Sequence, residues 1–222
     1  MAGKGVIVEF DFTVLNGAGL LFETAREFLR ALDGIEIDEA LEARHLAGNG
    51  YLAGLRGLFA TVKTKKTAQK AARELSAAFD EAVTAAARKA AQSMAFRNFV
   101  RALDERGVTV VISTRADLEQ VHPAFEALVG EHVRFYREIT DGYGFPTWDA
   151  WRRACAAHRL SYLTTRAVTG SGFGVKSALQ ARMGALAVIN DHVAYQDFGG
   201  ADAVVGELSG KTAKKVLEMM RI

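Results

Sequence analysis

The sequence predicts an α/β fold in which a doubly wound parallel sheet carries an all-helical cap, inserted after the first strand. Short apolar runs alternate with segments of helical periodicity over residues 92–222, which is typical of repeated β-α-β units. Residues 17–91 show helical periodicity and contain no strand-like run. We therefore expect a core formed by residues 1–16 and 92–222, and a helical cap formed by residues 17–91.

The expected strands of the core are short and apolar. The first is the run at 6–8, which leads into an acidic tip that contains Glu9, Asp11 and Thr13. The later strands are the runs VTVVIS, HVRFY, RAVT, ALAVI and ADAVV, at 108–113, 132–136, 166–169, 185–189 and 201–205. Helical segments separate them, at 96–107, 118–128, 148–155 and 175–183, and a last helix follows the final strand. In such a fold the functional site lies at the carboxyl ends of the strands.

The cap should contain four helices. The first ends at Gly34, two shorter ones lie near 37–47 and 51–62, and a long alanine-rich helix covers at least 68–86. We interpret a basic stripe on this long helix as a solvated face; it consists of Lys63, Lys66, Lys70 and Arg73.

Composition limits the function classes. The net charge of +2 over 222 residues gives no case for nucleic-acid binding. The first apolar run reaches Glu9 after three residues, which is too short for a signal peptide or a membrane span, so we expect no membrane partner. The single cysteine, Cys155, excludes an intrachain disulfide and favours a cytoplasmic location.

A glycine-rich octapeptide, GSGFGVKS, follows the RAVT run at 170–177. A Walker loop would need a glycine where Val175 stands, and a dinucleotide fingerprint would need its third glycine at Val175 or Ser177. The octapeptide therefore matches neither nucleotide-binding motif. Its backbone N–H groups, at the start of a helix, still make it a candidate anion site.

Several motifs, in the right order along the chain, resemble those of the haloacid dehalogenase (HAD) superfamily. VIVEFDFTV at 6–14 resembles the motif D-x-D-x-T that follows the first strand in that superfamily, and Ser113 matches the Ser or Thr of its second motif. FPTWD at 145–149 resembles K-P-x-P-D, and TGSGFGV at 169–175 resembles E-D-S-x-x-G-V at the expected separation. The helical insertion resembles the cap of the phosphoglucomutase and phosphoglycolate-phosphatase branch.

The resemblance implies phosphoryl-transfer chemistry that the sequence lacks in three places. In the family, the first Asp of motif I is the nucleophile, the second is the general acid/base, a lysine neutralises the intermediate, and acidic residues hold Mg²⁺. Here Glu9 stands at the nucleophile position, Phe145 at the lysine position and Gly170 at a metal-ligand position. The extra methylene of Glu9 displaces the carboxylate, and a displacement near 1 Å costs on the order of 100-fold in rate. The positions that still match are Asp11, Thr13 and Ser113.

We therefore expect a HAD-like protein that has lost phosphatase chemistry, needs no cofactor, and binds a phosphorylated small molecule, another anion or a protein partner. Glu9 would then be a structural acid that accepts backbone N–H bonds. Arg115 would either lie on the surface or supply the positive charge of the lost lysine. The residues expected at a ligand or phosphate site are Thr13, Ser113, Thr114, Arg115, Gly170, Ser171 and Gly172.

Two alternatives stay open. An active phosphatase would use Glu9, Asp11 and Ser113 as a degenerate catalytic site on a small phosphorylated metabolite, with Mg²⁺ held by Glu9 and the backbone of Asp11. In another register Lys176 is the motif lysine, and the fourth motif contains Asp191 and Asp197. In the main register, Asp191 lies in a solvated loop after the ALAVI strand.

Overall fold

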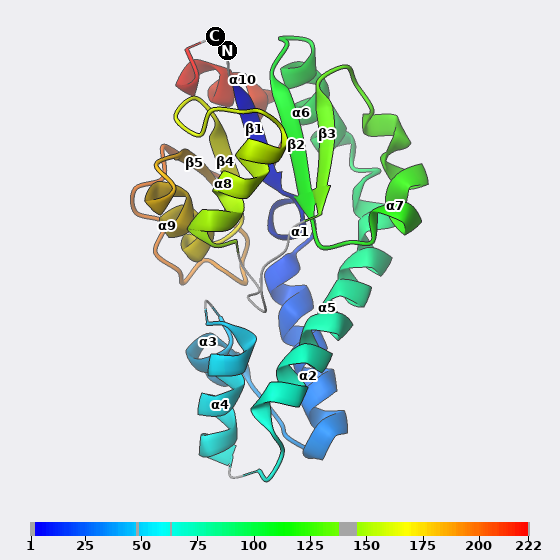
Figure 1. Cartoon of the computed structure of the whole chain (residues 1–222), viewed down its shortest axis with the longest axis vertical. Coiled ribbons are helices and arrows are strands. Elements are labelled where there is room, and N and C mark those ends of the chain that lie inside the picture. Colours follow the sequence, from blue (N-terminus) through cyan, green and yellow to red (C-terminus); the bar gives the residue numbers. More distant parts are fainter. Residues whose placement is uncertain (1–2, 48, 63, 138–145, 222) are drawn as a thin grey trace.

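The computed structural model of the chain describes residues 3–47, 49–62, 64–137 and 146–221. Its centre is a six-stranded parallel sheet in the order β3-β2-β1-β4-β5-β6. The strands are β1 (Gly5–Glu9), β2 (Thr109–Thr114), β3 (Val133–Arg137), β4 (Arg166–Thr169), β5 (Gly184–Val188) and β6 (Ala203–Val205). Because the strands are parallel, their carboxyl ends lie at one edge of the sheet, the edge that faces the cap (Figure 1).

Helices cover both faces of the sheet. Val6 and Val8 of β1 belong to one apolar cluster, with residues of α6 (Met94–Asp104), α7 (Leu118–Phe125) and α10 (Gly210–Met219). Ile7 belongs to a second cluster, with residues of α8 (Trp148–Ala157) and α9 (Gly172–Gln180). Successive strand residues point to opposite faces, so three consecutive apolar residues of β1 supply both halves of the core. This arrangement confirms the predicted doubly wound fold.

Four helices form the cap beyond the carboxyl edge of the sheet (Figure 1). They are α2 (Gly17–Asp33), α3 (Glu39–His45), α4 (Tyr51–Val62) and α5 (Ala68–Ala90). The side chain of Asn16 caps α2, and Gly34 ends it with φ +63°, a left-handed conformation that glycine adopts without a Cβ clash. Cap and core share apolar contacts: the rings of Phe12 and Phe79 have centroids 6.2 Å apart.

The expected basic stripe lies only partly on α5, because this helix begins at Ala68 and Lys66 precedes it. Lys66, Lys70 and Arg73 are all exposed, as expected, and Lys63 lies outside the described residues. No helix in the described ranges is long and apolar enough to cross a membrane.

Two elements at the functional edge differ from the prediction. A short helix, α1 (Phe10–Thr13), follows β1 directly and contains Asp11; its four residues are too few to show a period. The helix expected at 175–183 is α9, which begins at Gly172 and ends at Gln180. It begins earlier because the Oγ atom of Ser171 accepts the Gly174 N–H at 2.9 Å, which caps the first turn.

Candidate functional site

The ends of β1, β2 and β4 bring the motif residues together. Glu9 lies opposite Ser113 in the register of β1 and β2, and Val8 lies opposite Val168, which places Glu9 beside Thr169. These residues are almost fully buried: Glu9 is 2% exposed, Ser113 4% and Thr169 0%. The structure therefore brings together the acidic tip, motif II and the start of the glycine loop, as the sequence predicts.

The Glu9 carboxylate binds the chain itself. Its Oε2 atom accepts hydrogen bonds from the hydroxyl of Thr169 and, at 3.2 Å, from the backbone N–H of Gly170. The Glu9 carbonyl accepts a hydrogen bond from Thr13 Oγ1 at 2.7 Å. This geometry confirms the expected contact of Glu9 with backbone N–H, and turns its carboxylate toward β4.

The metal-ligand position is closed by backbone. A Cβ atom added to Gly170 would lie 2.0 Å from the carbonyl oxygen of Phe12, far inside van der Waals contact. An acidic side chain therefore does not fit here unless α1 moves. In the described part of the chain, no three acidic, histidine or cysteine side chains are grouped as a metal site requires. Of the two positions that resemble Mg²⁺ ligands of the HAD motif, Glu9 is thus hydrogen-bonded to Thr169 and the Gly170 N–H, and Gly170 is closed by backbone.

The glycine loop donates its N–H groups internally. The Gly170 N–H donates to Glu9 Oε2 at 3.2 Å, and the Ser171 N–H donates to Thr169 Oγ1 at 3.4 Å. That of Gly172 goes to Gln196 Oε1 at 2.8 Å. An anion at this loop would have to displace Gln196 and approach the Glu9 carboxylate, so the structure offers no ready phosphate cradle at these three residues.

Asp11 is buried at the centre of the site. One carboxylate oxygen accepts a hydrogen bond from Thr114 Oγ1 at 2.6 Å, and the other accepts the Arg115 N–H at 2.8 Å. Burial raises the pKa of this carboxyl from 3.8 to about 6, although both hydrogen bonds and the Arg115 charge lower it. Asp11 thus gains a proton close to neutral pH.

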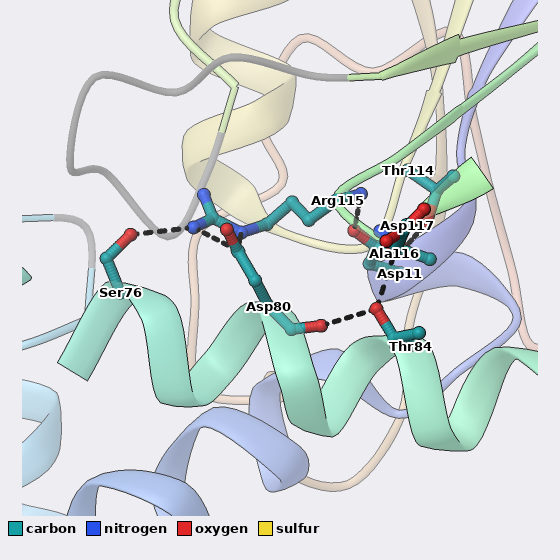
Figure 2. A network of polar contacts seen from close by, with 8 residues as sticks. All are labelled: Asp11, Ser76, Asp80, Thr84, Thr114, Arg115, Ala116 and Asp117. Atoms are coloured by element: carbon teal, nitrogen blue, oxygen red, sulfur yellow. Dashed lines mark hydrogen bonds and ion pairs between the residues drawn. The ribbon is translucent and has the colours of Figure 1, made fainter. Parts of the chain in front are cut away.

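Arg115 is not a surface residue, which corrects that expectation. It is 5% exposed, and its guanidinium forms an ion pair with Asp80 of α5 at 2.6 Å. It also donates to Ser76 Oγ at 2.9 Å (Figure 2). The guanidinium lies over the ring of Phe79, 5.4 Å from the ring centroid. Its guanidinium is therefore in contact with α5 of the cap.

The alternative register does not agree with the structure. Lys176 is exposed on α9 and pairs with Asp197 at 3.4 Å. Asp191 is exposed in the loop after β5, as the main register predicts. These groups lie on the surface and supply no lysine or metal ligand to the buried Glu9. Phe145, the residue at the lysine position in the main register, lies outside the described residues.

The structure has a groove between α4 and α5 that the sequence did not predict. Its volume is about 690 Å³, and it runs along α5 from Gln69 to Asp80. Arg56 of α4 and Arg73 of α5 line it, and neither forms an ion pair with the described residues. Leu52, Ala53 and Ala72 add apolar surface. Arg73 stood out in the sequence only as part of the basic stripe, and nothing in the sequence pairs it with Arg56.

No protein-family model and no curated protein matches the chain, whereas solved structures match nearly all of it. A HAD hydrolase of family IA, variant 3, from Entamoeba histolytica has a TM-score of 0.69 at 14% identity, covering 99% of this chain and 100% of that one. β-Phosphoglucomutase from Clostridium difficile has a TM-score of 0.68 at 12% identity, covering 99% of this chain and 100% of that one. A mutant of CbbY from Rhodobacter sphaeroides, in complex with xylulose-(1,5)bisphosphate, has a TM-score of 0.66 at 14% identity, covering 94% of this chain and 95% of that one. At such identities the shared feature is the fold.

Proposed function

We propose that this chain, which has the fold of the HAD-family hydrolases, binds a small acidic ligand and does not hydrolyse it. The observation that carries the proposal is the closed position at Gly170, where the Phe12 carbonyl fills the space that a metal-binding side chain would need. Phosphoryl transfer depends on positive charge around the transferred group. Without a metal ligand here, that charge is hard to assemble.

The state of Glu9 supports the loss of catalysis. A nucleophilic carboxylate must face the phosphorus atom in line with the leaving group. Glu9 instead directs its Oε2 atom to Thr169 and the Gly170 N–H. Attack would require breaking these buried contacts.

The groove between α4 and α5 supports a binding function. Two guanidinium groups that form no ion pair with the described residues flank apolar surface, in a space that fits a small organic molecule. Guanidinium binds phosphate and carboxylate groups through paired N–H donors. We therefore propose a ligand that combines an acidic group, such as a phosphate ester, with an apolar or neutral body.

A cytoplasmic location belongs to the same proposal. The lone Cys155 is buried, and burial raises the pKa of its thiol to about 11. Such a thiol is mostly protonated and unreactive. These features agree with a protein of a reducing compartment that uses no cysteine chemistry.

Residual phosphatase activity is the second candidate function, and Asp11 is the observation that favours it. A buried carboxyl with a pKa of about 6 is suited to proton transfer near neutral pH. This candidate requires turnover that depends on a divalent ion, which the proposed binding protein does not have.

The binding test uses phenylphosphonate, which carries an acidic group on an apolar ring and cannot be hydrolysed as an ester. We expect calorimetry to show that Arg56→Gln and Arg73→Gln each weaken binding about tenfold, because each removes one charged donor. Lys214→Gln on α10 is the matched control, since it removes one exposed charge far from the groove (Figure 1). Equal affinity in the wild type and all three variants would reject the groove as the site.

A further inference from the structure

One face of α5 carries three polar side chains that bind the core. Ser76, Asp80 and Thr84 are spaced four residues apart, so they lie on the same face of the helix. All three contact the segment that follows β2 (Figure 2). Arg115 donates to Asp80 through Nε at 2.7 Å and to Ser76 through Nη2 at 2.9 Å. The Asp117 N–H donates to Thr84 Oγ1 at 3.0 Å.

Two of these three residues also line the groove. Ser76 and Asp80 form the part of the groove wall nearest the core, and Arg115 binds both of them. Asp80 and Arg115 also line a second cavity of about 440 Å³, between α5 and the core. The Asp80 carboxylate therefore stands between the Arg115 guanidinium and the groove.

The Asp80 side chain has the chemistry of the ligand proposed above. It is a carboxylate that holds a guanidinium through charge-assisted hydrogen bonds, which is how Arg56 and Arg73 would hold an acidic ligand. Its side chain is 33% exposed, whereas that of Arg115 is 6% exposed. Solvent and ligands can thus reach the carboxylate more readily than the buried cation behind it.

We infer that Asp80 is an autoinhibitory pseudo-ligand, whose carboxylate occupies an Arg115 guanidinium that would otherwise bind the acidic group of a ligand in the groove. The inference rests on the proposed function, because it assumes that the groove binds acids. A ligand with a stronger acidic group competes with Asp80 for Arg115. By linkage, occupancy of the groove then weakens the contact between α5 and the core.

The two partners of the ion pair should have opposite effects on binding. Asp80→Asn removes the competing negative charge beside Arg115, so we expect phenylphosphonate to bind about tenfold more tightly. Arg115→Gln leaves an unpaired carboxylate at the groove, so binding should weaken several-fold. In the double variant, Asp80→Asn with Arg115→Gln, the gain in phenylphosphonate affinity that Asp80→Asn gives alone should disappear. Glu81→Gln is the charge-matched control on α5: Glu81 is exposed, and its loss should change affinity less than twofold.

Other patterns of affinity overturn the inference. If Asp80→Asn leaves affinity unchanged or lowers it, or if its gain persists without Arg115, Asp80 is not a competitor. This failure is distinct from failure of the proposed function, in which the wild-type affinity does not depend on Arg56 and Arg73.

A measurement on the wild type guards against variants that do not fold. In NMR spectra, the Nε–H resonance of Arg115 should shift on saturation with phenylphosphonate, as its acceptor changes from Asp80 to the ligand. An unchanged Arg115 resonance in a saturated protein would overturn the inference.

Discussion

At the scale of single residues, Gly170 and Phe12 define what the site can hold. The carbonyl of Phe12 comes so close to Gly170 that no side chain fits between them in this conformation. The position that holds a metal ligand in the HAD motif is thus filled by backbone. Replacing the glycine with the acid of the motif should therefore not restore the motif.

We expect Gly170→Asp to lower the free energy of unfolding by about 3 kcal/mol, because the new side chain must displace α1. Urea denaturation with and without Mg²⁺ measures this, and Mg²⁺ should not restore stability. Gly210→Ala is the control, since its Cβ meets nothing within 4 Å; its effect should stay within about 1 kcal/mol. A Gly170→Asp protein that is as stable as the wild type and is stabilised by Mg²⁺ would refute this account of the site.

Asp11 should make stability depend on pH. Its pKa rises from 3.8 to about 6 on folding because the carboxyl is buried, so between these values the folded state binds more protons than the unfolded state. The stabilisation is complete below pH 3.8 and is lost as pH rises through about 6, with a total of about 3 kcal/mol. Unfolding curves from pH 4 to 7, compared with those of Asp11→Asn, isolate this contribution. A wild type and variant with parallel pH profiles would contradict it.

At the scale of elements, α5 is the helix that joins cap and core. Its apolar residues pack with the cap and with Phe12, and its polar face holds the segment after β2 (Figure 2). Thr84 is the simplest member of that face, because it carries no charge. Its hydroxyl donates to the Asp80 carbonyl at 2.7 Å and accepts the Asp117 N–H at 3.0 Å.

Thr84→Val should destabilise the protein by about 1–2 kcal/mol, because the Asp117 N–H loses its acceptor while the side-chain shape is kept. Hydrogen exchange at that amide should become faster at the same time. Thr61→Val is the matched control: Thr61 is exposed on α4 and donates only to a carbonyl of its own helix, at 3.0 Å. Equal losses of stability in the two variants would show that the contact with the core contributes nothing.

The sequence predicted the elements better than the contacts between them. Apolar periodicity was sufficient to predict the six strands and the four cap helices. It missed α1, which spans only four residues, and it placed the start of α9 three residues late because the cap at Ser171 leaves no periodic signal. The groove was missed because it arises where α4 packs on α5, and the burial of Arg115 was missed because its partner, Asp80, lies 35 positions away.

At the scale of the whole molecule, the fold is kept although the residues at the motif positions differ. The chain shares its fold with HAD hydrolases at 12–18% identity, while Glu9 and Gly170 depart from the catalytic motif. Packing of the sheet requires apolar residues of suitable volume, which many sequences supply. Phosphoryl transfer requires particular charged groups at particular points, so a few substitutions remove it while the fold persists.

The most direct test of this account is phosphate release from a broad panel of phosphorylated metabolites, measured with Mg²⁺ and with EDTA. Release by the folded wild-type protein should equal that of Asp11→Asn on every compound, in both conditions. Release that depends on Mg²⁺ and disappears in Asp11→Asn would contradict it, and would show that Glu9 and Asp11 still form a working active site.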